Sequence, residues 1–111
     1  MTTIWIDDGV AVVGVDGDRL DAAATPAFKQ ALDSGLSTDV RAVILDASGL
    51  AFVDSTGLGA IVGVMKRLPE GATLVIAGAQ APLKRLLQIT SLDRLFRQFD
   101  SVEEARAALG N

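Results

Sequence analysis

Short apolar runs alternate with helical patterns along the chain, and this alternation constrains the fold more than any other feature. Residues 43–45 form a continuous apolar run, typical of a central strand covered on both faces, and residues 73–77 predict another buried strand. Apolar residues between them recur at the i, i+3, i+4 and i+7 spacing of a helix: Leu58, Ile61, Val62 and Met65. We therefore expect an α/β domain, with a mixed sheet of four to five strands packed with about four helices.

The first third of the chain predicts a hairpin followed by a helix. Residues 4–6 and 10–15 predict two strands, joined by an Asp8-Gly9 turn. A polar stretch, residues 16–21, interrupts the sheet pattern. Thr25-Pro26 predicts the start of the first helix, with Thr25 as its cap and proline at a position that needs no N–H donor.

The last third predicts two helices separated by an edge strand. Pro82 opens one helix, and residues 96–99 alternate like a short strand at the edge of a sheet. Ser101 and Glu104 have the spacing of a capping box ahead of a last helix, which Gly110 ends.

Length and composition limit the functions that the chain can have. The 111 residues match the usual size of one domain, and 50% of them are hydrophobic, enough for an ordinary core without metals or disulfides. With no cysteine and no histidine, neither a Ser-His-Asp triad nor a cysteine nucleophile can be assembled, and no phosphate-binding loop is present. We expect no catalytic residue, no metal site and no cofactor, and therefore no enzyme.

Charge and hydropathy indicate where such a chain works. Its net charge of −4 does not favour binding to nucleic acid, which requires a basic face. The N-terminus shows no signal peptide, and the longest apolar run, residues 57–65, is far shorter than the roughly 20 residues of a membrane-spanning helix. We expect a cytoplasmic protein with no membrane insertion.

The most informative segment follows the strand that ends near Asp46. A short loop is expected to carry Phe52 and Val53 back toward the core, and Asp54-Ser55-Thr56 then stands at the start of the second helix. A helix start exposes unpaired N–H groups and the positive end of the helix dipole, so a phosphate on Ser55 would occupy a site suited to an anion. Gly57 and Gly59 are expected to leave room for another protein to approach.

The same residues also have a purely structural interpretation. A hydroxyl or carboxylate at a helix start is often only a cap, worth about 1 kcal/mol. The two glycines equally suit close packing of the helix on the sheet, and Asp21 suits a turn.

The whole segment resembles the signature of a known family. Leu45-Asp46, Phe52 and residues 54–59 are similar to the central motif of STAS domains, especially the bacterial anti-sigma factor antagonists. Weaker similarity covers nearly the full chain, through residues 17–21, 86–92, Phe99 and Glu104-Ala105. Two residues depart from the family pattern: Arg19 is an extra residue in a loop expected to flank Ser55, and Ser91 replaces a frequent glycine at a local turn.

The resemblance implies one STAS domain over residues 1–111 that acts as a phosphorylation-controlled partner switch. In this family the serine after the aspartate, here Ser55, is the phosphorylation site. The unphosphorylated form binds an anti-sigma factor, often itself a serine kinase that uses ATP and magnesium, and thereby frees a sigma factor. A PP2C-type phosphatase resets the switch. We expect the partner to contact Asp21, Asp54, Ser55, Thr56, Gly57 and Gly59.

Two other roles remain open within the same family. Some STAS domains are unphosphorylated adaptors that dock onto the ATPase of an ABC-type transporter or belong to larger sensor assemblies. Asp54-Ser55 favours the switch, because an adaptor does not need a hydroxyl there. A nucleotide-binding module is the third possibility, although no phosphate-binding loop supports it.

Overall fold

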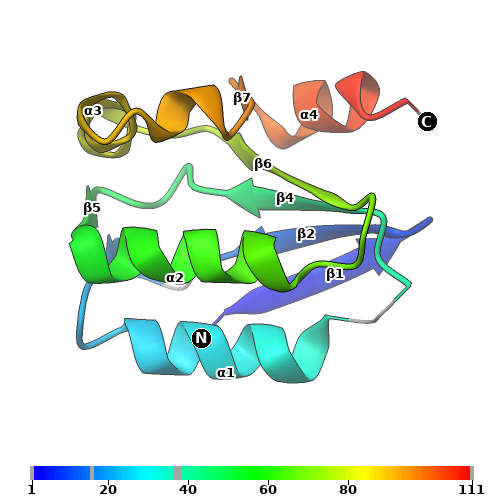
Figure 1. The fold of residues 1–111 in the computed structure, drawn as a ribbon, viewed down its shortest axis with the longest axis horizontal. Helices are drawn as coiled ribbons and strands as arrows, with labels where there is room; N and C mark the ends of the chain where they lie inside the picture. The colour runs from blue at the N-terminus through cyan, green and yellow to red at the C-terminus, as the bar shows by residue number, and fades with distance from the viewer. Residues whose placement is uncertain (1, 16, 37–38, 111) are drawn as a thin grey trace.

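A five-stranded mixed sheet forms the centre of the structure, a computed structural model that describes residues 2–15, 17–36 and 39–110 (Figure 1). The strands lie in the order β1-β2-β4-β6-β7. β1 and β2 are antiparallel, and the pairs β2–β4, β4–β6 and β6–β7 are parallel. The strands of this sheet are β1 (Thr3–Asp7), β2 (Val10–Gly14), β4 (Ala42–Asp46), β6 (Thr73–Ala77) and β7 (Gln98–Phe99).

The turn between β1 and β2 has the geometry that its sequence predicts. Asp8 and Gly9 have φ angles of 54° and 77°, both in the left-handed region that two-residue hairpin turns require. Thr3 pairs with Gly14 and Asp7 with Val10, so the register is that of a tight hairpin. The predicted hairpin is confirmed, although its second strand ends at Gly14 rather than at residue 15.

β4 is the central strand, as its continuous apolar run predicts. Val43 and Leu45 belong to the large core on one face of the sheet, and Ala42 and Ile44 belong to a smaller core on the other face. All four side chains are buried. The strand ends at Asp46, whose half-buried side chain stands at the carboxyl edge of the sheet.

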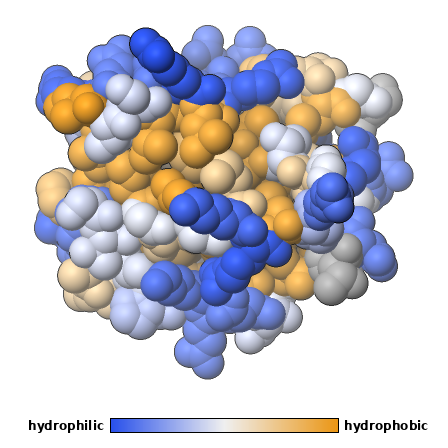
Figure 2. Space-filling model, in the orientation of Figure 1, coloured by the Kyte–Doolittle hydropathy of each residue, from blue (hydrophilic) through white to orange (hydrophobic). Residues whose placement is uncertain are grey.

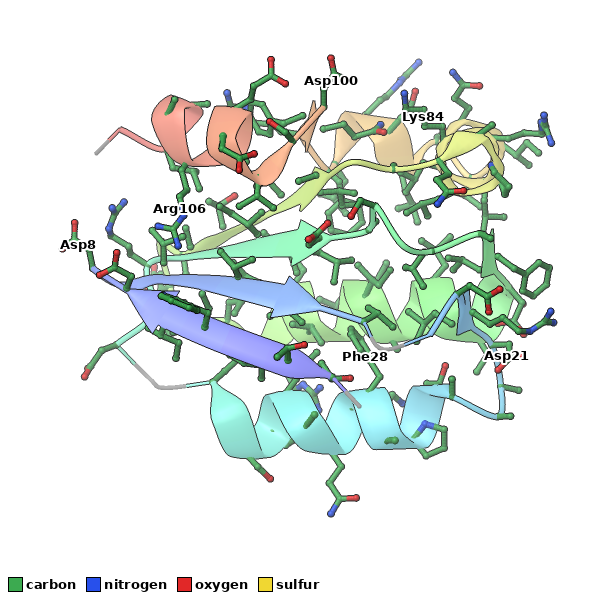
Figure 3. The ribbon with its side chains drawn as sticks, turned by 180° about the vertical axis from the view of Figure 1, so that it is seen from behind. Asp8, Asp21, Phe28, Lys84, Asp100 and Arg106 are labelled. Atoms are coloured by element: carbon green, nitrogen blue, oxygen red, sulfur yellow. The ribbon has the colours of Figure 1, made fainter. Side chains whose placement is uncertain are left out.

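Four α-helices pack on this sheet. α1 and α2 lie side by side over one face, and α4 packs against β4, β6 and β7 on the other (Figures 1 and 3). Leu83 and Leu87 of α3 complete the large core. These elements confirm the predicted fold class: α1 (Thr25–Gly35), α2 (Ser55–Arg67), α3 (Ala81–Ile89), the 3₁₀ turn η1 (Leu92–Arg94) and α4 (Val102–Ala108).

The start of α1 differs from the prediction. Thr25 is the first helical residue rather than its cap, and the cap position, Ala24, has no side chain that accepts a hydrogen bond. The Thr25 side chain is buried, and its hydroxyl donates to the carbonyl oxygen of Asp21 over 2.7 Å. The Thr25 N–H donates to the same carbonyl oxygen over 2.9 Å, and the Asp21 carboxylate accepts the N–H groups of Ala23 and Ala24 in the turn before the helix. The predicted cap was wrong because the Thr25 hydroxyl donates to a carbonyl oxygen of the preceding turn instead of accepting a helix N–H group.

A second, two-stranded sheet was not expected. Within the polar stretch of residues 16–21, β3 (Arg19–Leu20) pairs in parallel with β5 (Phe52–Val53). This pairing holds the loop before α1 against the segment that leads into α2. Leu20 is paired with Val53, so the pairing brings together two parts of the chain that are 33 residues apart in the sequence.

The C-terminal elements follow the sequence signals closely. The Ser101 hydroxyl accepts the N–H of Glu104 over 3.1 Å, which is the first of the two hydrogen bonds of a capping box and caps α4. The edge strand is shorter than predicted, residues 98–99, because Phe96 is buried in the large core instead. Ser91 has a φ of 62°, the left-handed conformation in which glycine is the usual residue. In the part of the chain that the structure describes, no helix combines the length and apolarity needed to cross a membrane.

Candidate functional site

Ser55 is the first residue of α2, and its side chain is exposed. The cap of this helix is Asp54, whose Oδ1 accepts the N–H of Gly57 over 2.9 Å. Asp54 has an extended backbone with a φ of −98° and a ψ of −177°, the usual conformation of a capping residue. Because the carboxylate takes the capping role, the Ser55 hydroxyl has no hydrogen-bond partner among the described residues. The helix cap suggested by the sequence is therefore Asp54, and the Ser55 hydroxyl is not used as a cap.

Asp54 also ties α2 to the loop that precedes α1. Its Oδ2 accepts the N–H of Ala22 over 3.2 Å, and its own N–H donates to the carbonyl oxygen of Leu20 over 3.3 Å. One half-buried carboxylate thus satisfies N–H groups from two segments. This arrangement fixes where the loop lies relative to Ser55.

Asp21 occupies the turn at the other side of this junction (Figure 3). Its Oδ1 accepts the N–H groups of Ala23 and Ala24 over 3.1 and 3.0 Å, and its Oδ2 lies 3.2 Å from Nε of Arg19. The bond from Ala24 first, and then the Arg19 guanidinium, hold the pKa of the Asp21 carboxyl below its usual range. The turn interpretation of Asp21 is therefore right, and it places this residue beside the loop that Asp54 holds.

Phe52 lies on the surface, whereas the sequence predicted that it points into the core. Its side chain is 41% exposed, and its neighbour Val53 is buried. The guanidinium of Arg19 lies 4.7 Å from the centre of the Phe52 ring. The alternation of β5 explains the difference, since only one of two consecutive strand residues can face inward. The Arg19–Phe52 pair thus forms an exposed surface next to Ser55 that the sequence did not reveal.

The two glycines of the motif have different surroundings. Gly57 is buried, and a Cβ there would overlap the carbonyl oxygen of Leu20 and come within 2.9 Å of its carbonyl carbon. This glycine therefore allows α2 to pack against β3, which is the close-packing interpretation of the motif glycines. Gly59 is exposed, and a Cβ added there would meet no atom within 4 Å. Thr56 is exposed as well.

The chemistry of this site is that of an exposed hydroxyl beside a capping carboxylate. Among the described residues, no group of three or more acidic side chains could hold a metal ion. A cavity of about 400 Å³ lies at the carboxyl ends of β4 and β6, but its polar lining includes three carboxylates, which repel the phosphates of a nucleotide. These carboxylates belong to Asp46, Asp100 and Glu103.

Comparison with known proteins gives a consistent result. A family model described as STAS domain matches residues 3–105. An anti-sigma-B factor antagonist from Staphylococcus aureus is 30% identical over 88 residues, which cover 78% of this chain and 82% of that protein. An anti-sigma-F factor antagonist from Mycobacterium tuberculosis is 22% identical over 103 residues, 93% of this chain and 84% of that protein. The crystal structure of an anti-sigma factor antagonist from Mycobacterium paratuberculosis superposes with a TM-score of 0.88 and 26% identity, covering 100% of this chain and 94% of that one.

Proposed function

The chain belongs to the STAS domain family, and on that premise we propose that it is an anti-sigma factor antagonist switched off by phosphorylation of Ser55. Unphosphorylated, it binds an anti-sigma factor that is also a serine kinase, and so frees a sigma factor. A PP2C-type phosphatase restores the active form. In this proposal residues 1–111 act as one cytoplasmic STAS domain, a binding protein without catalysis of its own.

The observation that carries the proposal is the free, exposed hydroxyl of Ser55 at the start of α2. Asp54 already caps the helix, so Ser55 is not needed to satisfy a backbone N–H group. A phosphate there would meet the positive end of the dipole of a 13-residue helix. The fold should therefore tolerate the modification.

Binding would be far more sensitive to the phosphate than folding. Phosphorylation adds about 1.5 to 2 negative charges at neutral pH, directly beside the Asp54 carboxylate. Burying that charge under a partner without a cationic match costs several kcal/mol. A loss of about 3–4 kcal/mol weakens binding by a few hundredfold. Charge at the interface can thus switch binding without a large conformational change.

The first test is intact-mass analysis after incubation with ATP, magnesium and each anti-sigma factor kinase of the source organism. We expect one added phosphate on the wild-type chain and on Thr56→Ala, and none on Ser55→Ala. Thr56 is the matched control because it is the adjacent exposed hydroxyl on the same helix turn. No phosphate with any active kinase would instead favour the unphosphorylated adaptor of a transporter or sensor assembly.

The second test compares binding of Ser55→Asp and Ser55→Ala to the kinase that modifies the chain. Ser55→Ala should bind like the wild type, and Ser55→Asp should bind at least tenfold more weakly, since aspartate carries less charge than a phosphate. The unfolding midpoints of both variants in urea should match that of the wild type. Equal binding of the two variants would contradict a charge-controlled interface.

A further inference from the structure

Within the described part of the chain, β1 has a neighbouring strand on one side only, because it begins the sheet order β1-β2-β4-β6-β7. The other edge strand, β7, has two residues, whereas β1 has five. Natural proteins protect edge strands through short length, proline, lysine or a β-bulge. The five residues of β1 include neither proline nor lysine, and they pair without interruption with β2. This edge is therefore open to a further strand.

One face of β1 is uncovered as well. Trp5 is 70% exposed, and it lies opposite Val12 of β2, which packs against the smaller core on the α4 face of the sheet. α4 packs against β4, β6 and β7, and no helix crosses β1 when the molecule is seen from behind (Figure 3). Tryptophan is enriched in protein interfaces, because its large apolar ring gains much from burial. An exposed tryptophan beside an open strand edge therefore indicates a place where a second strand is added.

The hairpin register determines which backbone groups of β1 point to the open edge. Asp7 and Val10 flank the two-residue turn, so this pair exchanges both of its hydrogen bonds. Pairs of this kind recur at every second residue toward the start of the strand. The N–H and C=O groups of Ile4 and Ile6 consequently point away from β2. No hydrogen bond from another described segment reaches these groups.

From the open edge and the exposed Trp5, we infer that β1 forms a homodimer, in which two copies of the chain pair their β1 strands antiparallel about a two-fold axis at Trp5. Ile4 of each copy then lies opposite Ile6 of the other, so the outward N–H and C=O groups of both residues find partners. The two Trp5 side chains form a non-hydrogen-bonded pair, in which opposite side chains approach most closely, and aromatic pairs across strands are stabilising. α2 takes no part in this pairing, so the inference does not depend on the proposed function.

The side chains of β1 match a second copy in this register. On the face of Trp5, Thr3 of each copy lies opposite Asp7 of the other, so a hydroxyl donor faces a carboxylate acceptor. No other position of the axis pairs all five residues of the strand. An axis at Asp7 would also set two aspartates opposite each other, and like charges in that position are destabilising.

Sedimentation equilibrium at protein concentrations from about 1 to about 500 µM tests this inference, because an interface as small as one strand pair is weak. We expect a dimer with a Kd of roughly 10–100 µM. Trp5→Lys should weaken dimerisation at least tenfold, since it sets two lysines on the axis. Mixing Trp5→Lys with Trp5→Glu in equal amounts should restore a dimer, because opposite charges then meet. Unfolding midpoints of both variants in urea should match that of the wild type.

Ile89→Lys is the matched control, because Ile89 is 73% exposed on α3 and Figure 2 shows a separate apolar area over α2 and α3. This variant should dimerise like the wild type. Self-association that Ile89→Lys abolishes and Trp5→Lys preserves would overturn the inference and assign the contact to that apolar area. A monomer at every concentration would also overturn it and leave the edge to a strand of a different protein.

The register is tested by cross-linking, since the chain has no cysteine of its own. Trp5→Cys should form an intermolecular disulfide under mild oxidation, because opposite residues of a non-hydrogen-bonded pair lie close enough for this bond. Ile89→Cys, exposed on α3, should remain largely monomeric under the same conditions. Equal cross-linking of the two variants would contradict an axis at Trp5.

Discussion

The buried and exposed sides of the segment from Asp54 to Gly59 are built from adjacent residues with opposite tasks. On the buried side, Gly57 lies against the Leu20 carbonyl, and Asp54 accepts N–H groups of Gly57 and Ala22. On the exposed side, Ser55 and Gly59 make no such contact. The difference teaches that one short motif can combine residues that stabilise the fold with residues that stay accessible on the surface. Substitutions on one side should change stability, and those on the other side should change binding.

The largest effect on stability is expected for Gly57→Ala. The new Cβ would overlap the Leu20 carbonyl. This carbonyl cannot move freely, because it accepts the Asp54 N–H and its strand, β3, is paired with β5. We expect the free energy of unfolding to fall by about 3 kcal/mol, as for severe overpacking. Urea unfolding followed by circular dichroism measures it.

Gly59→Ala is the control on the exposed side. A Cβ there meets no atom within 4 Å, and alanine is the better helix former. The free energy of unfolding should rise by roughly 0.5–1 kcal/mol. Equal losses of stability in Gly57→Ala and Gly59→Ala would contradict the distinction between a buried and an exposed side of the segment.

A smaller effect is expected for Asp54→Ala. This change removes the acceptor for the N–H groups of Gly57 and Ala22, and we expect a loss of about 1–2 kcal/mol in the free energy of unfolding. Asp54→Asn should lose less, since one amide oxygen still accepts one of the two bonds. Urea unfolding of the two variants in parallel measures the difference. A larger loss for asparagine than for alanine would contradict the assigned bonds.

The smallest effect is a pH dependence from Asp21. Because N–H groups and Arg19 lower the pKa of its carboxyl in the folded protein, its stabilising contribution is present above the unfolded pKa, roughly pH 4. The contribution is lost as the pH falls through the lower folded pKa. The stability difference between the wild type and Asp21→Asn should therefore shrink as the pH is lowered from about 6 to about 3. A difference that grows toward acid pH would contradict the sign of the shift.

Much of the fold was predictable because the strongest signals are local. The Asp8-Gly9 turn, the apolar run of β4 and the helix cap at Ser101 each depend on residues close in sequence. The start of α1 was not predictable in this way, since no side chain caps it and both the N–H and the hydroxyl of Thr25 donate to the backbone carbonyl of Asp21. The outward position of Phe52 also depends on which face of β5 meets the core.

The sequence by itself determined the alternation of strands and helices, the place of Ser55 at a helix start and the resemblance to STAS domains. These follow from periodicity, capping chemistry and a contiguous motif. Only the tertiary structure decided which residues of the motif are buried and which are exposed on the surface. The pairing of β3 with β5 brings Leu20 against Gly57 and Arg19 against Phe52, contacts between segments more than thirty residues apart. Burial depends on such distant partners, and no local pattern specifies them.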